Sequence, residues 1–285
     1  MINAIRFSHF PKNILIMIPV LISGVTFNNT FFIELLKILL IFFFLTNCCY
    51  IINDYTDRKI DKINKLKSSH TISYKSSFIL FSIFFACLIF FLIAFNNHNI
   101  LSVYIYFLNF IIYNFYIKKI KYLDLFFLTN FYIIRIFCGI EVFNLEISYG
   151  FLIFAYCFFL SFSILKRLIQ IRKNKLLKKN KIIAYNLKDC RTLEGALKSF
   201  MLINIIIFIL YVFYNLNYLE FRDYVFVYNF PSDKIITIFF IYLFFISRIL
   251  YSYFKRNINK DIYRYVIKDK YSYFISIFII IIFLG

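Results

Sequence analysis

Glycine and histidine are scarce in this 285-residue sequence, and their scarcity excludes several classes of site. With only 5 glycines, the chain has no glycine-rich phosphate loop and no fingerprint of a dinucleotide-binding fold. The 3 histidines form no metal cluster with cysteine and no serine–histidine–aspartate arrangement. The 6 cysteines lie mostly inside apolar runs, at no disulfide or metal-ligand spacing, and act there as small hydrophobic residues.

Apolar residues dominate instead and set the class of protein. They make up 62% of the chain, and the mean hydropathy is +0.77. A soluble globular domain has roughly 45–50% apolar residues, so this composition predicts a polytopic membrane protein. The net charge of +19 would suggest a nucleic-acid partner in a soluble protein, but its distribution indicates a membrane and no nucleic acid. No repeat or flexible linker is evident, so we expect a single integral-membrane domain over residues 1–285.

Apolar runs long enough to cross a hydrocarbon core of roughly 30 Å predict an all-α fold with nine transmembrane helices. We place them at residues 14–32, 35–53, 77–95, 100–117, 122–140, 147–165, 199–218, 234–253 and 271–285. If the N-terminus is cytoplasmic, the inner segments hold 28 of the 33 lysines and arginines, as the positive-inside rule requires. The first run also has the form of a signal peptide, but this alternation of charge requires it to remain as the first span.

The segment NDYTDRKID, residues 53–61, follows the second predicted span and carries three of the 14 acidic residues. Asp54, Asp57 and Asp61 are spaced by three and then four residues, so a continuous helix would place them on one face. Such carboxylates repel one another unless cations lie between them, and Mg²⁺ prefers one or two carboxylates together with phosphate oxygens. We therefore predict a metal–diphosphate site at the cytoplasmic membrane surface. The alternative is a solvated helix end neutralised by its basic neighbours, Arg58, Lys59 and Lys62.

Basic and phenolic groups near the cytoplasmic ends of the spans could bind phosphates through charge-assisted hydrogen bonds. They are Lys67, Tyr113, Lys118, Lys119, Lys166 and Arg167. Taken singly, each charge is more often a determinant of membrane topology. Arg135 differs because it lies in the middle of a predicted span, where an unpaired charge is costly, so we expect a partner or a polar cavity. A site residue and a buried structural pair with an acid both remain open for Arg135, and Asp124 lies three turns earlier in the same span.

Six short motifs follow one another along the chain. They are RFSHFPKN (6–13), NDYTDRKID (53–61), NKLKSSHT (64–71), YNFYIKK (113–119), FYIIRIFCG (131–139) and LKRLIQI (165–171). In their order and placement they resemble the UbiA-type superfamily of intramembrane prenyltransferases. Within that superfamily the chain is most similar to the decaprenyl-phosphate phosphoribosyltransferase branch. The resemblance covers almost the whole chain, and the acidic motif is its most specific part.

The resemblance implies a UbiA-like helix bundle in a bacterial inner or plasma membrane, with its site facing the cytoplasm. It also implies Mg²⁺-dependent transfer of a phosphoribosyl group from phosphoribosyl diphosphate to a polyprenyl phosphate, with release of pyrophosphate. Asp54, Asp57 and Asp61 would be the catalytic, metal-binding residues. The residues implied to contact the substrates are Lys12, Asn13, Asn53, Lys67, Tyr113, Lys118, Arg135, Lys166 and Arg167.

The sequence departs from the family pattern at His70 and Gln170, among other positions. It also leaves two other functions open. His70 stands where the family has an arginine and Gln170 where it has a glutamate, which could alter the substrate or weaken the activity. A prenyltransferase acting on an aromatic or quinone-precursor acceptor is one alternative. Members of that kind resemble one another in a second acidic motif, whereas the predicted loop 166–198 has only Asp189 and Glu194 as acids. A non-catalytic membrane homologue or a small transporter is the other alternative.

Overall fold

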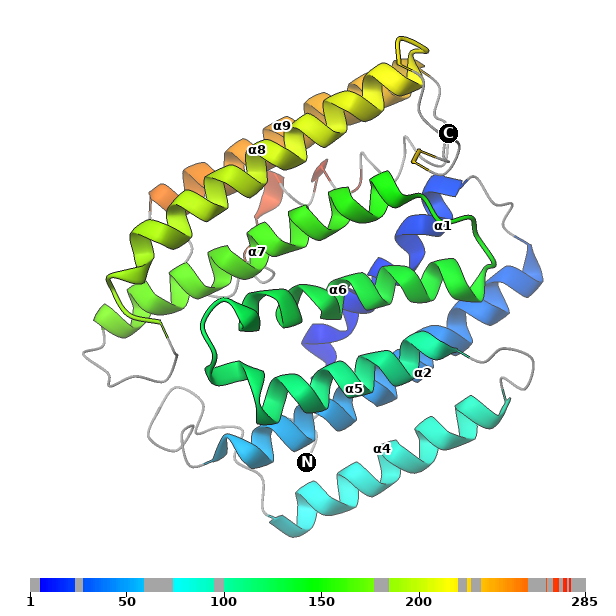
Figure 1. Ribbon diagram of the computed structural model, residues 1–285. Helices are drawn as coiled ribbons and strands as arrows, with labels where there is room; N and C mark the ends of the chain where they lie inside the picture. Colours follow the sequence, from blue (N-terminus) through cyan, green and yellow to red (C-terminus); the bar gives the residue numbers. More distant parts are fainter. Residues whose placement is uncertain are drawn as a thin grey trace. The chain divides into compact units, whose positions relative to one another are not determined.

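The computed structural model describes residues 6–23, 28–58, 74–94, 100–176, 185–219, 225–226, 232–255, 265, 269–271, 274–275 and 277. All regular structure in these residues is helical, and none of them lies in a strand (Figure 1). The chain divides into two compact units. One consists of Met1–Lys118 and Ile134–Leu145, and the other of Lys119–Ile133 and Glu146–Gly285.

Six helices are long and apolar enough to cross a membrane, which indicates an integral multi-pass membrane protein. They are α2 (Asn29–Thr56), α4 (Tyr74–Ala94), α6 (Leu123–Val142), α7 (Tyr149–Leu176), α8 (Asp189–Asn215) and α9 (Ser232–Phe254). The shorter elements are the 3₁₀ segment η2 (Phe7–Met17), α1 (Ile18–Ser23), α5 (Leu101–Phe115) and the 3₁₀ turn η4 (Ile117–Lys119). Six of the nine predicted spans are thus confirmed as long apolar helices, and the ninth falls almost entirely outside the described residues.

The predicted first span, 14–32, is wrong as a single helix. Its residues are divided among η2, α1 and the first turn of α2, with residues 24–27 outside the described part. Asn28 sets the start of α2, because its side-chain oxygen accepts a hydrogen bond from the Phe31 N–H at 2.8 Å. From this cap α2 runs without interruption through the boundary predicted near residue 34.

The polar loop predicted at 166–198 is also partly wrong, because α7 continues to Leu176 and α8 begins at Asp189. Lys166 and Arg167 therefore lie on a helix. Leu165, Leu168 and Ile171 are buried around these two charges, so the helical spacing of apolar residues continues past the end of the apolar run. The first charged residues after an apolar run therefore show where α7 leaves the apolar layer, but the helix itself continues for about ten more residues, to Leu176.

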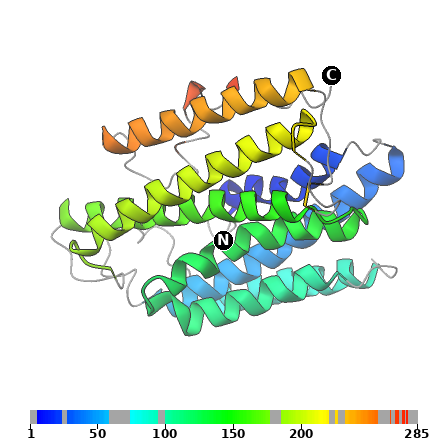
Figure 2. The ribbon, with the colours of Figure 1, turned by 45° about the horizontal axis from the view of Figure 1, so that its top comes forward.

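In the first unit, α2 and α4 lie side by side, as both views of the ribbon show (Figures 1 and 2). Cys48 and Ile51 of α2 pack against Leu80 and Phe84 of α4. The rest of α4 is largely exposed, as expected for a helix that faces lipid on most of its surface.

Two contacts of α6 organise the remainder of this unit. Glu141 accepts the backbone N–H groups of Leu101 at 2.6 Å and Ser102 at 3.0 Å, so a carboxylate caps the positive N-terminal end of α5. Two residues earlier, the missing side chain of Gly139 lets the backbone of η2 approach, since a Cβ there would lie 2.0 Å from the Ile16 carbonyl oxygen. A glycine is needed at position 139 for this close approach.

The core of the second unit is built from α7, α8 and α9. Leu165, Leu168, Leu193, Leu197 and Ile249 are among its most deeply buried residues. Within this apolar core, Asn204 of α8 donates to the Phe154 carbonyl of α7 at 2.7 Å and accepts a hydrogen bond from the Tyr242 hydroxyl of α9. One amide therefore joins three helices where lipid and apolar side chains offer no other polar partner.

The surroundings of Gly139 and Gly195 predict opposite changes in stability when each glycine is replaced by alanine. Gly139→Ala forces a methyl group against the η2 backbone and should lower the stability by about 1–3 kcal/mol. Gly195→Ala, on the exposed side of α8 with no atom within 4 Å of the added Cβ, should raise it by about 0.5–1 kcal/mol. Thermal unfolding of the purified protein in detergent measures both, and a shift of the same sign for the two variants would contradict the packing.

Candidate functional site

The acidic motif lies at the C-terminal end of α2. The helix ends at Thr56, and Asp57 is its C-cap, with its N–H bonded to the Asn53 carbonyl at 2.9 Å. Asp54 lies in the last turn. The C-terminal end of a helix carries a partial negative charge, so two carboxylates at this end are unfavourable unless cations accompany them.

Arg6 supplies the first of these cations. Its guanidinium pairs with Asp54 and lies over the Tyr50 ring, 4.7 Å from the ring centroid. Its backbone N–H donates to the buried side chain of Asn47 at 3.0 Å. Arg6 was not among the predicted site residues, because nothing local to the acidic motif indicates a partner 48 residues earlier.

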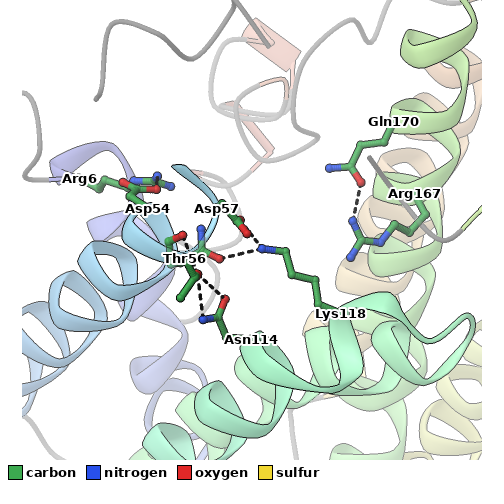
Figure 3. A network of polar contacts seen from close by, with 9 residues as sticks. Arg6, Asp54, Thr56, Asp57, Asn114, Lys118, Arg167 and Gln170 are labelled. Atoms are coloured by element: carbon green, nitrogen blue, oxygen red, sulfur yellow. Dashed lines mark hydrogen bonds and ion pairs between the residues drawn. The ribbon is translucent and has the colours of Figure 1, made fainter. Parts of the chain in front are cut away.

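Lys118 supplies the second cation from η4, just after α5. Its ammonium group pairs with Asp57 and donates to the side-chain oxygen of Asn53 at 3.1 Å (Figure 3). Beside it, the Asn114 amide donates to the Thr56 hydroxyl at 3.2 Å. The structure thus brings Lys118 into contact with two other predicted site residues, Asn53 and Asp57.

The cluster of Arg6, Asn53, Asp54, Asp57 and Lys118 is accessible to a ligand. The four charged side chains are between 17% and 30% exposed, so water and small ions reach each of them. We refer to these five residues as the α2 end cluster. It combines hard oxygen donors with two cations, a composition that suits a metal-bound diphosphate.

The predicted two-turn acidic face is only partly described. Asp61 and Lys67 lie outside the described residues, and α2 already ends at Thr56. Within the part of the chain that the structure covers, no group of three or more His, Cys, Asp or Glu lies close enough to hold a metal ion. Asp54 and Asp57 are therefore the described carboxylates of the motif, with Asn53 as a further oxygen donor.

Arg135 is buried on α6 and has the polar partners that its position demands. Its Nε donates to Asn13 Oδ1 at 3.0 Å, and its Nη2 donates to the Tyr106 hydroxyl at 2.8 Å. The guanidinium carbon also lies 4.8 Å from the centroid of the Tyr106 ring. Two predicted substrate contacts, Asn13 and Arg135, are thus bonded to each other. Lys12 on η2 and Tyr113 on α5 are partly exposed.

In the second unit, Arg167 belongs to a buried ion pair. Its Nε donates to Asp124 at 2.5 Å. Its Nη1 donates to Gln170 at 2.6 Å, as Figure 3 shows. Asp124 also accepts the hydroxyl of Tyr185, which in turn accepts the Tyr122 N–H at 2.7 Å. Asp124, noted from the sequence as a neighbour of Arg135, therefore pairs with Arg167. Lys166 lies beside this pair in the sequence and is partly exposed.

Tyr185 ties the segment before α8 to this pair and has a perturbed titration. Burial and the hydrogen bond to Asp124 raise the pKa of Tyr185 above its ordinary value of about 10. The neutral phenol is the form that the fold stabilises. This contribution to stability is complete below about pH 10 and is lost as the pH rises through the raised pKa.

Neither the models of known protein families nor the curated proteins compared with this chain match it. The resemblance to the UbiA-type superfamily therefore rests on the six sequence motifs.

The different burial of the Asp124 and Asp189 ion pairs predicts that substitutions at these sites lower the stability by different amounts. Asp124→Asn leaves the buried Arg167 without its counter-charge and should cost about 3–5 kcal/mol. Tyr185→Phe removes one hydrogen bond and should cost about 1 kcal/mol. Asp189→Asn, in the more exposed pair with Lys121, should cost less than about 1 kcal/mol. Unfolding in detergent with chemical denaturant ranks the three, and equal losses for Asp124→Asn and Asp189→Asn would contradict the assignment.

Proposed function

We propose that this chain is a UbiA-type membrane transferase that moves the phosphoribosyl group of phosphoribosyl diphosphate onto a polyprenyl phosphate, releasing pyrophosphate. The observation that carries the proposal is the α2 end cluster, in which two of the three predicted acidic residues, Asp54 and Asp57, pair with cations at the end of an apolar helix. A nine-span topology with a cytoplasmic N-terminus is part of the proposal. It is supported by the 28 of 33 basic residues on the predicted inner side, and it gives the cluster access to soluble phosphoribosyl diphosphate.

The donor atoms of the cluster fit Mg²⁺. Asp54 and Asp57 would hold the ion, with Asn53 as a further oxygen ligand, since Mg²⁺ takes one or two carboxylates and completes its shell with water and phosphate oxygens. When bound, the ion neutralises negative charge on the diphosphate and stabilises it as a leaving group. The third acid of the motif, Asp61, is proposed as a further ligand from the sequence alone.

The reaction needs few groups from the protein. A phosphate oxygen of the lipid attacks the anomeric carbon of the ribose, and the bond from that carbon to the diphosphate oxygen breaks. The electron pair of the broken bond leaves with pyrophosphate. The attacking oxygen is already anionic, so no proton has to be removed and no general base is required. Lys118 and Arg6 can then stabilise the negative charge of the departing diphosphate, while the apolar helices exclude water.

The number and spacing of the acids in residues 166–198 favour the phosphoribosyl branch over prenyl transfer to an aromatic acceptor. A second metal-binding motif would have to use the acids of residues 166–198, which are Asp189 and Glu194. Asp189 pairs with Lys121 at 2.7 Å, and Glu194 pairs with Arg172 at 2.9 Å and accepts the Tyr253 hydroxyl at 2.8 Å. They are five residues apart on α8, which places them on different faces of the helix, so they form no second acidic motif.

The proposal predicts a lipid-linked product in a direct transfer assay. Membranes containing the protein are incubated with Mg²⁺, polyprenyl phosphate and labelled phosphoribosyl diphosphate, and label is measured in the lipid extract. Asp57→Asn should reduce the product about 100-fold or more, because it removes a charged ligand of the diphosphate-bound metal. Glu34→Gln, at the opposite end of α2, removes the same charge away from the cluster and should leave the activity unchanged.

The donor is tested in the same membranes by competition. The membranes could instead transfer a prenyl group from prenyl diphosphate to a small aromatic acceptor and make no product from phosphoribosyl diphosphate. That result would contradict the proposed reaction and identify the chain as an aromatic prenyltransferase. No product from either donor, with well-expressed and folded protein, would indicate a non-catalytic membrane protein.

A further inference from the structure

Each side chain that would hold the metal already has one oxygen atom bonded to a cation of the protein. Lys118 donates to Asn53 Oδ1 at 3.1 Å and pairs with Asp57, while Arg6 pairs with Asp54. All three oxygen-bearing side chains of the described metal site are thus engaged, each by an ammonium or guanidinium group.

A metal ion and these cations compete for the same side chains, because a metal bound to the second oxygen of either carboxylate lies next to the cation on the first. Mg²⁺ lies about 2.1 Å from its oxygen ligands, and an ammonium group in hydrogen-bond contact with the same oxygens would then be only a few ångströms from a doubly charged ion. Repulsion between like charges at that separation is large in a partly buried site. Binding of the metal therefore weakens the contacts of Lys118 with Asn53 and Asp57 and of Arg6 with Asp54, and it favours displacement of both cations.

The displaced cations need new acceptors. Free Mg²⁺ brings only water, so it would leave two cations without their counter-charges beside a third positive charge. Mg²⁺ bound to a diphosphate brings phosphate oxygens within reach of the same two side chains. Lys118 has a flexible four-carbon stem and is 30% exposed, and Arg6 is 25% exposed, so each can turn from carboxylate to phosphate without unpacking the core.

We propose that Arg6 and Lys118 are exchangeable counter-ions that hold the carboxylates of the α2 end cluster until a diphosphate-bound Mg²⁺ replaces them. The cluster consequently binds the metal weakly by itself and strongly together with the diphosphate. The cations stabilise the acidic helix end before the donor binds and contact the diphosphate afterwards. This inference rests on the metal site of the proposed function and adds Arg6 to the residues that position the donor.

The test measures metal binding to the full-length protein in detergent, apart from any transfer activity. Mn²⁺ serves as the probe for the Mg²⁺ site, and its free fraction is read by electron paramagnetic resonance with and without inorganic pyrophosphate. Lys118→Met should bind Mn²⁺ alone about three- to tenfold more tightly than the wild type, because a competing cation is gone. It should bind Mn²⁺ with pyrophosphate about three- to tenfold more weakly, because a phosphate contact is gone.

Arg6→Met should show the same crossed pattern, that is, tighter binding of Mn²⁺ alone and weaker binding of Mn²⁺ with pyrophosphate. It replaces Lys118→Met as the test if that variant fails to fold. Lys75→Met, an exposed lysine at the start of α4, makes the same change in net charge and should alter neither affinity. Asp57→Asn should weaken both kinds of binding, which separates loss of a ligand from loss of a competitor.

The outcomes distinguish this inference from the proposed reaction. Equal effects of Lys118→Met on the two affinities, or no effect on either, would overturn the exchange of counter-ions and leave the metal site standing. No Mn²⁺ binding by the wild type under either condition would overturn both the exchange and the metal site. A crossed pattern in a protein that does not use phosphoribosyl diphosphate would support the exchange and reject only the proposed donor.

Discussion

A polar or charged group can lie among apolar helices only if another polar group meets it there, and this constraint accounts for most of the tertiary contacts that matter. Arg135 is met by Asn13 and Tyr106, and Asp124 is met by Arg167 and Tyr185. Each pair joins elements that are far apart in the sequence. Because lipid offers these groups no alternative partner, such contacts determine which apolar helices associate, whereas the apolar side chains alone are less selective.

The α2 end cluster applies the same constraint where the helix meets water. Two carboxylates at a helix C-terminus oppose the helix dipole, and the cost is offset by Arg6 and Lys118. A stable apolar bundle would not need acids at this position. Their presence beside two partly exposed cations supports the proposed recognition of a metal-bound diphosphate, which requires closely spaced charges of both signs.

The sequence predicts the class of fold well and its pairings poorly. Long apolar runs predict helices directly, which is why six spans are confirmed. Hydropathy does not show where a capping side chain starts a helix, as Asn28 does for α2. It also does not show that a helix continues past the end of its apolar run, as α7 does at Lys166. The partners of Asp54 and Asp57 lie 48 and 61 residues away, so their identity depends on the folded chain. A polar partner for Arg135 could be predicted, because an unpaired charge inside any apolar span is costly. The sequence could not identify Asn13 as that partner.

The N-terminal segment has an unusual place in the order of assembly. Asn13 bonds to a residue 122 positions later, and Ile16 packs against the bare backbone at Gly139. Residues 6–23 are therefore synthesised long before the helix that receives them, and they reach their final packing only after α6 has entered the membrane. Contacts of such high sequence separation slow folding. Arg6 lies in the same segment but pairs with α2 only 48 residues later, so one short segment links the acidic end of α2 to a helix made much later in synthesis.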